Sequence, residues 1–294
     1  MIMKTGFIIV NYNSWEMTEK LALKTASYKN IDAVVVIDNA STDGSYQHLK
    51  NMSHKKLHVF QNDRNGGYSF GNNYGAIICR RLGMEIVFIA NPDVWVGEAH
   101  IQKILDRFAD SGYSVLSGVE YDAYGNMCRP PLWKRRQYWD DFGDCFFLWR
   151  CCSRKNFGIE LYQNAGVQRA EMVKGAFLAV RLEDFLDVEG FDEQIFLYCE
   201  ERVLAKKMES SGRKIGIVAD AQYTHTHSAS IQKTYRRVSQ QMGILYQSRL
   251  YYHQKYSRIG RWRYILLAAA MKVSLLEYQI RDWLRLRKNY KESQ

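Results

Sequence analysis

The first 120 residues alternate short apolar runs with longer segments in which apolar residues recur every three or four positions. The runs are rich in β-branched residues and have strand lengths, whereas the longer segments have the period of amphipathic helices. The predicted strands are Lys4–Val10, Ala33–Ile37, Leu57–Phe60, Ile86–Ala90 and Ser114–Leu116. The predicted helices lie near Ser14–Ser27, Ser41–Asn51, Ser69–Arg81 and Glu98–Asp110. This βαβ series predicts an α/β fold with a mostly parallel sheet flanked by helices.

Polar side chains follow three of the predicted strands, at the sheet edge where ligands of such folds bind. Asn11 and Tyr12 follow the first strand, and Asp38 follows the second. Asn91 and Asp93 follow the fourth. Asp38 can accept from the imide of a pyrimidine base that lies against Tyr12, and Asp93 can hold a divalent cation that also contacts a diphosphate. These residues predict a nucleotide diphosphate site.

Purely structural roles for these residues are the alternative to this interpretation. Asp38 could brace a turn, and we expect Ser41 to cap the second helix. The sequence has neither a GxGxxG motif after the first strand nor a GxxxxGK[ST] loop. Their absence disfavours a dinucleotide oxidoreductase and a P-loop NTPase.

A glycine-rich stretch, Asn62–Ala76, follows the third predicted strand. Within it, Asn65 and Asn72 offer side-chain amides to a sugar or a phosphate. Gly71 and Gly75 either allow a ligand to approach the backbone or allow a helix to pack closely on the sheet. Both interpretations of the glycines stay open at this point.

The positive charge is concentrated at the C-terminal end. Residues 231–294 contain 14 Lys and Arg but 3 Asp and Glu, a net charge of +11 within a total of +10. A near-neutral body argues against nucleic acid as a partner, whereas a basic, aromatic tail favours an anionic membrane surface. The alternative is a helix pair that packs on the rest of the chain or on a second subunit of a homo-oligomer.

The N-terminal segment predicts the compartment. Its apolar run is too short for a signal sequence or a membrane span. A cytoplasmic location is therefore expected, at the inner face of the plasma membrane if the tail attaches there.

Seven segments occur in an order that resembles the inverting family-2 glycosyltransferases, notably the rhamnosyltransferase-like branch. They are FIIVNYNS, VVVIDNASTDGS, NDRNGGYSFGNNYG, ANPDV, KGAFLAVR, GFDEQIFLYCEE and HTHSAS. The resemblance implies a GT-A fold over residues 1–230, followed by a basic, aromatic helical tail over residues 231–294. Within the first part it implies a nucleotide-sugar half (1–120), an insertion near the acceptor (120–168) and an acceptor half (169–230).

The resemblance also implies a metal site. Asp38 would contact the base of the nucleotide sugar. Asn91-Pro92-Asp93 stands where the family keeps its DxD-type motif, with Asn91 in place of the first acid. Asp93 would hold Mg²⁺ or Mn²⁺, which neutralises the diphosphate leaving group. His225 would be a second ligand, with His227 as the alternative.

A general base is implied at Glu200-Glu201, where the family usually has Glu-Asp and uses the second acid. Glu201 is therefore the expected base and Glu200 its rival. Val203 stands where the family has a further acid. The alternative interpretation is a pair of acids that merely favours a helix N-terminus.

These features together predict a metal-dependent glycosyltransferase. By resemblance, the donor is dTDP-rhamnose and the acceptor is a saccharide or a lipid-linked saccharide in cell-surface polysaccharide synthesis. A nucleotidyltransferase also uses an α/β sheet, acidic metal ligands and nucleotides. A catalytically inactive nucleotide-sugar-binding protein is the non-enzyme alternative, motivated by Asn91, Glu201 and Val203.

Overall fold

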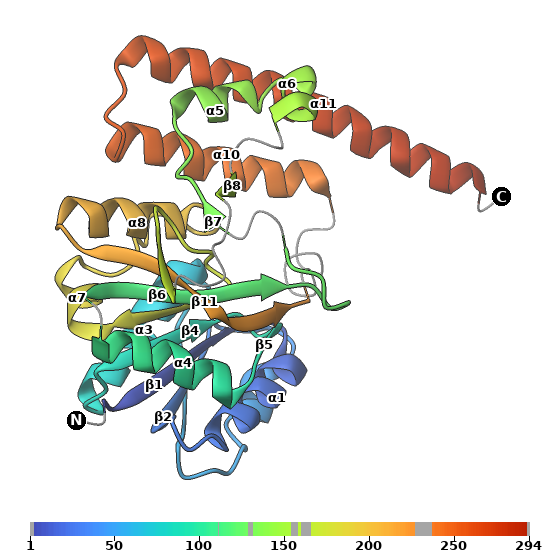
Figure 1. Ribbon diagram of the computed structural model, residues 1–294. Helices are drawn as coiled ribbons and strands as arrows, with labels where there is room; N and C mark the ends of the chain where they lie inside the picture. Colours follow the sequence, from blue (N-terminus) through green and yellow to red (C-terminus); the bar gives the residue numbers. More distant parts are fainter. Residues whose placement is uncertain are drawn as a thin grey trace.

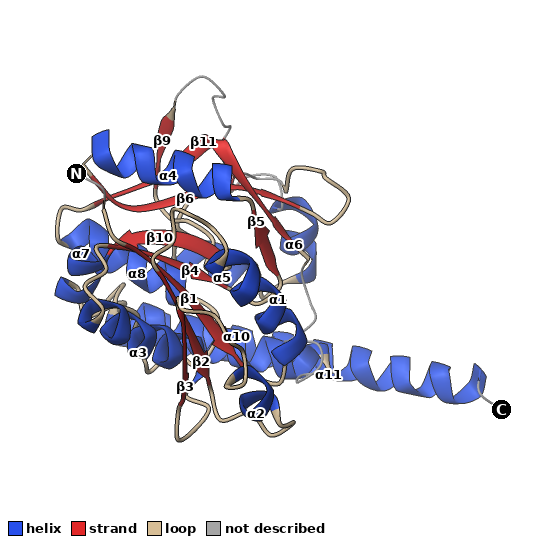
Figure 2. Ribbon diagram, turned by 90° about the horizontal axis from the view of Figure 1, so that it is seen from below, coloured by secondary structure: helices blue, strands red, loops and turns tan. Residues whose placement is uncertain are grey.

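A computed structural model describes residues 3–110, 112–128, 132–153, 158–159, 166–226 and 237–292. The strands of its main sheet are β1 (Thr5–Asn11), β2 (Ala33–Asp38), β3 (Leu57–Gln61), β4 (Ile86–Ala90), β5 (Val94–Val96), β6 (Tyr113–Tyr121), β9 (Val167–Ala170), β10 (Phe177–Arg181) and β11 (Lys214–His225). Their order is β3-β2-β1-β4-β10-β6-β11-β5, with β9 paired to β11 (Figure 1 and Figure 2). A separate hairpin pairs β7 (Leu132–Trp133) with β8 (Gly158–Ile159).

Helices cover both faces of the sheet (Figure 2). Side chains of β1 alternate between two cores, since Phe7 and Ile9 belong to one and Ile8 to the other. The helices on the first face are α1 (Trp15–Ala26), α2 (Ser45–Leu49) and α4 (Glu98–Asp110). Those on the second face are α3 (Gly67–Arg81), α7 (Leu182–Asp187) and α8 (Glu200–Ser210). The predicted α/β fold with flanking helices is confirmed.

The sheet is mixed in strand direction. Strands β1 to β4 pair in parallel, as the βαβ pattern predicts. Strand β10 enters antiparallel between β4 and β6, and β5 runs antiparallel to β11. Strand β6 extends to Tyr121, beyond the predicted end at Leu116, because it pairs along its length with β11.

The structure decides the local roles of Ser41 and of two glycines in the glycine-rich stretch. Ser41 does not cap α2, which begins four residues later after Gly44. The Ser41 hydroxyl instead accepts from the backbone N–H of Asn13 (2.9 Å) and ties the first two strand ends together. In α3, a Cβ at Gly71 or Gly75 would lie 2.8 Å from Val10 or 2.7 Å from Ile8. These two glycines therefore serve close packing of the helix on β1.

A further helical layer lies above the sheet (Figure 1). It consists of α5 (Tyr138–Gly143), α6 (Phe147–Ser153), α10 (Val238–Lys255) and α11 (Arg261–Glu292). Helix α10 contacts the region around α8, because the Ser248 hydroxyl donates to the Leu197 carbonyl (2.7 Å). In the described part of the chain, no helix is both long enough and apolar enough to cross a membrane. The tail thus contains a helix pair that packs on the rest of the chain, while the boundary at residue 230 stays a prediction.

Candidate active site

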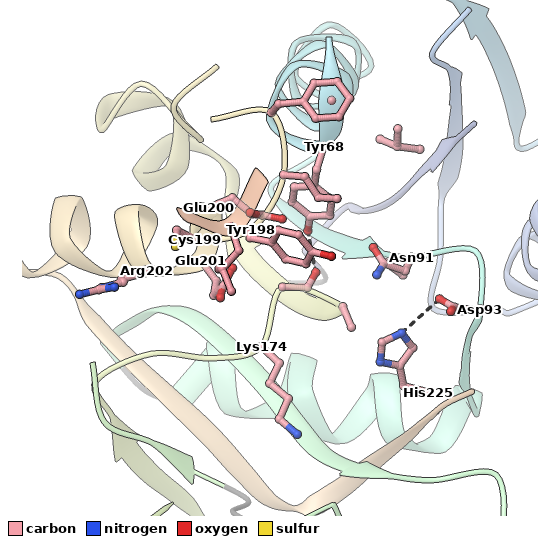
Figure 3. A pocket seen from close by; sticks show the side chains of 18 of the residues that line it. Tyr68, Asn91, Asp93, Lys174, Tyr198, Cys199, Glu200, Glu201, Arg202 and His225 are labelled. Carbon is pink, nitrogen blue, oxygen red and sulfur yellow. Dashed lines mark hydrogen bonds and ion pairs between the residues drawn. The ribbon is translucent and has the colours of Figure 1, made fainter. Parts of the chain in front are cut away.

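One pocket of about 580 Å³ opens at the carboxyl ends of β1 and β4. Predicted site residues in its lining are Tyr12, Asn65, Asn91, Asp93, Glu200, Glu201 and His225. Residues 200 and 201 lie on the opposite side of the pocket from Asp93 and His225 (Figure 3). The fold therefore brings the predicted metal ligands and the predicted base to one cavity.

Asp93 and His225 face each other across the junction of β5 and β11. The antiparallel register pairs His225 with Val94, directly after Asp93. As a result, His225 Nε2 lies 3.2 Å from Asp93 Oδ1. On the other side of the ring, Nδ1 lies 3.1 Å from Oε1 of the buried Glu120. Burial lowers the pKa of His225, but its contacts with Asp93 and Glu120 outweigh burial and raise it to about 9.

Glu120 was not anticipated from the sequence. Its carboxylate also forms an ion pair with Lys174, which precedes β10. Burial raises the pKa of Glu120, but the contacts with His225 and Lys174 outweigh burial and lower it to about 2. Glu120 therefore stays ionised and orients the imidazole of His225. Among the described residues, no three His, Cys, Asp or Glu side chains form a preassembled metal cage.

Asp38 and Asn11 lie behind the pocket wall. Their positions pair in register across β1 and β2, and both side chains are fully buried. The Asn11 side-chain amide donates to Asp38 (2.8 Å), and the backbone N–H of Ser41 also donates to it (3.0 Å). Asp38 braces the two strand ends in this structure, and its contact with a base stays a prediction.

The two asparagines of the glycine-rich stretch lie in different environments. Asn65 lines the pocket and accepts from the backbone N–H of Gly67 (3.1 Å), at the start of α3. Asn72 is buried in α3, and its side-chain amide donates to the Tyr68 carbonyl (3.0 Å). Asn72 does not line this pocket. Its donor-binding role stays a prediction.

The acid pair begins α8 after an unusual backbone turn. Tyr198 and Cys199 both have positive φ values, 68° and 67°, which non-glycine residues rarely adopt. Such strain is held in place where the surrounding structure demands it, commonly at functional sites. Here the turn delivers Glu200 and Glu201 to the pocket at the positive end of the α8 dipole.

Burial distinguishes the two acids. Glu200 is almost fully buried, and its Oε2 has no hydrogen-bond partner among the described residues. Glu201 is partly exposed, and its Oε2 lies toward Gly175, whose carbonyl accepts from the Tyr68 hydroxyl (2.6 Å). Burial raises the pKa of both carboxyls, and the charge of Glu201 raises that of Glu200 further. Glu201 is the more accessible acid.

A buried charge cluster fixes α8 to the upper helical layer. Asp141 of α5 is fully buried and lies 2.6 Å from Arg202 of α8. It also lies 3.3 Å from Arg249 and 2.9 Å from His253, both on α10. Burial raises the pKa of Asp141, but the charges of Arg249 and Arg202 outweigh burial and hold it well below its ordinary value. Arg202 and Arg249 also line the pocket, so the cluster positions one of its walls.

Replacing Asp141 with asparagine is expected to lower the free energy of unfolding by about 3–5 kcal/mol, because buried guanidinium groups lose their charge partner. Urea denaturation would measure this loss. Asp63→Asn is the matched control, because Asp63 lies 3.9 Å from Arg64 in an exposed pair and its replacement should change stability little. Equal stabilities of the two variants would contradict the role of the cluster.

His227, the alternative metal ligand, lies outside the described residues. His225, the preferred ligand, is described at the end of β11.

Comparisons with known proteins agree with this geometry. The protein-family model "Glycosyl transferase family 2" matches residues 7–159, more than half of the chain. The low-salt glycan biosynthesis hexosyltransferase Agl10 of Haloferax volcanii is 33% identical over 116 residues, which cover 38% of this chain and 35% of that protein. This chain thus matches about a third of the length of that relative.

Solved structures share the fold at low sequence identity. The mannosyltransferase PcManGT from Pyrobaculum calidifontis, in complex with GDP-Man and Mn²⁺, has a TM-score of 0.59 and 16% identity, with 98% of this chain and 82% of that chain covered. S. aureus TarS 1-349 with UDP-GlcNAc has a TM-score of 0.56 and 16% identity, covering 92% and 72%. These matches identify the fold as GT-A. Given the family model that spans more than half of its residues, the chain belongs to glycosyltransferase family 2.

Proposed function

We propose that the chain transfers a sugar from a nucleotide diphosphate donor to a hydroxyl group of a saccharide or lipid-linked saccharide, with inversion at the anomeric carbon. One observation carries this proposal. A single pocket holds a carboxylate and an imidazole 3.2 Å apart on one side and an accessible acid, Glu201, on the other. An in-line displacement requires this arrangement, because the leaving group is stabilised on one side of the anomeric carbon and the acceptor is deprotonated on the other.

The residues present fit a divalent cation. Asp93 Oδ1 and His225 Nε2 lie 3.2 Å apart, so the two would hold one Mg²⁺ or Mn²⁺ together once the imidazole loses the Nε2 proton that its raised pKa retains at neutral pH. Once bound, the cation would neutralise charge on the diphosphate leaving group. Glu120 would hold the His225 ring so that Nε2 stays directed at that position.

Glu201 would act as the general base. It would take the proton from the acceptor hydroxyl as the acceptor oxygen bonds to the anomeric carbon. The bond from that carbon to the diphosphate oxygen breaks at the same time, and the nucleoside diphosphate leaves with the electron pair. Burial raises the pKa of Glu201 above its ordinary value, which strengthens it as a proton acceptor.

The donor is proposed to be dTDP-rhamnose, with UDP-linked hexoses as the next choice. The sequence segments that resemble rhamnosyltransferases support the first choice, and the hexosyltransferase relative supports the second. Acceptors from cell-surface polysaccharide synthesis are proposed on the same resemblance. Residues 1–120 would bind the donor, while residues 120–168 and 169–230 would bind the acceptor.

A panel of nucleotide sugars, scored by thermal shift with Mn²⁺, tests the donor. A donor present at about 100 to 1,000 times its Kd should stabilise the fold by about 3–4 kcal/mol. EDTA is the control and should remove the effect. If no nucleotide sugar raises the unfolding temperature with metal present, the proposed donor site is wrong.

Product analysis separates the proposed transferase from its two alternatives. A transferase releases nucleoside diphosphate in the presence of an acceptor. A nucleotidyltransferase instead releases pyrophosphate from a nucleoside triphosphate and a sugar phosphate. An inactive binding protein shows the thermal shift but neither product.

A further inference from the structure

Helix α11 has two apolar faces, of which only one is covered. On the covered face, Leu267, Ala270 and Met271 form a core with Tyr138 of α5 and Tyr246 of α10. Eight large apolar side chains of the same helix are exposed, namely Trp262, Ile265, Leu266, Val273, Leu276, Ile280, Trp283 and Leu284. At 100° per residue they fall within an arc of roughly 100°, on the side opposite to Met271. We call these eight residues the outer stripe.

Helix α6 extends the apolar surface beside the outer stripe. Phe147, Leu148 and Trp149 of α6 are exposed. Arg150 fixes α6 to α11 through an ion pair with Glu277 (2.7 Å). The guanidinium of Arg281 also lies over the Phe147 ring, 5.3 Å from its centroid. The exposed apolar side chains of α6 are thus held beside α11 on the upper layer.

Basic side chains border the outer stripe. Helical geometry places Arg261 and Lys272 along one edge and Arg263 and Arg281 along the other. All four are exposed. Two acids of α11 are engaged within the fold, since Glu277 pairs with Arg150 and Asp282 accepts from the backbone N–H of Ser239 (2.9 Å). Of the four basic residues, Arg281 also pairs with Glu277 (3.2 Å), so the surface presents apolar and aromatic groups with basic side chains along both edges.

The C-terminal turns of α11 project beyond the rest of the molecule (Figure 1). They carry Ile280, Trp283 and Leu284 of the outer stripe. An isolated helix with exposed large apolar residues is stabilised when an apolar phase covers them. The charge pattern identifies that phase, because a second copy of this surface would bring rows of like charge together, whereas anionic headgroups would neutralise them.

We propose that the outer stripe and the adjoining side chains of α6 form a surface that lies in the interface of an anionic lipid bilayer, with α11 parallel to the membrane plane. Tryptophan at the level of the headgroups and arginine beside it suit such a position. The proposal extends beyond the sequence-based expectation for the tail, because it adds α6 and specifies which face of α11 contacts lipid. It is independent of the transfer reaction.

Vesicle sedimentation with the full chain tests the proposal. Vesicles of phosphatidylcholine with about one third phosphatidylglycerol should bind the unmodified protein, with binding that weakens as salt rises. The double variant Val273→Asp/Leu276→Asp places two charges in the outer stripe, where these side chains are 66% and 58% exposed and their replacement should not disturb the core. Its affinity for the vesicles should fall at least about tenfold.

The matched control is Leu23→Asp/Ile77→Asp, which adds the same charge at apolar positions that are 40% and 43% exposed on α1 and α3. This control should bind vesicles within about twofold of the unmodified protein. Equal binding by the stripe variant, or no vesicle binding by the unmodified chain, would overturn the proposal. A dimer that the stripe variant converts to a monomer, without vesicle binding, would show instead that a second copy covers the surface.

Discussion

Replacing Asp93 with alanine is expected to reduce sugar transfer by about 10²- to 10⁴-fold, which corresponds to a loss of roughly 3–5 kcal/mol of transition-state stabilisation. Asp93 is the only acid in the Asn91-Pro92-Asp93 motif, and its Oδ1 lies 3.2 Å from His225 Nε2. The variant would therefore remove the only carboxylate that this motif offers to the proposed cation. Initial rates at saturating Mn²⁺ would measure the loss.

Two controls keep this result interpretable. EDTA should reduce transfer by the unmodified enzyme to a similar level, and it should have little further effect on the variant. Asp63→Ala removes an exposed acid that does not line the pocket and should retain activity. Unchanged, EDTA-insensitive transfer by Asp93→Ala would remove the metal assignment.

Glu201→Gln should lose transfer by roughly 10²- to 10⁴-fold while retaining donor affinity, because the amide cannot take the acceptor proton. The substitution keeps the size of the side chain at the N-terminus of α8. Thermal shift with donor and metal would report the intact donor site, and single-turnover rates would report the lost step. Donor affinity should hold because Glu201 lies across the pocket from Asp93 and His225 (Figure 3).

Glu200→Gln is the matched comparison for that prediction. Glu200 is buried, so its neutral amide should alter transfer far less than the change at Glu201. If Glu200→Gln shows the large defect and Glu201→Gln does not, the assignment of the two acids is reversed.

Local sequence pattern predicted much of the N-terminal part of the sheet. The β-branched runs placed β1 to β4 within about one residue of their observed ends. The rule that ligands bind beyond strand ends then led to Tyr12, Asn91 and Asp93, which all line the pocket. Such predictions succeed because strand formation and the position of strand ends depend mainly on nearby residues.

The rule that ligands bind beyond strand ends would also have identified Glu120, had the sequence pattern shown that its strand extends to Tyr121. The segment from Tyr113 to Tyr121 contains Ser117, Gly118 and Glu120, which interrupt its apolar pattern. Pairing with β11 keeps this segment extended despite those residues. Strand β11 begins at Lys214, far along the sequence from β6, so the residues near β6 could not indicate that β11 pairs with it.

The sequence by itself determined the alternation of strands and helices, the acids at the strand ends and the excess charge of the tail. Tertiary structure decided that His225 meets Asp93, that Asp38 and Asn72 are buried, and that Asp141 binds Arg202 and Arg249. It also decided which apolar face of α11 is covered. The physical reason is that periodicity records which side chains are apolar or charged, whereas burial and pairing depend on which segments the fold brings into contact.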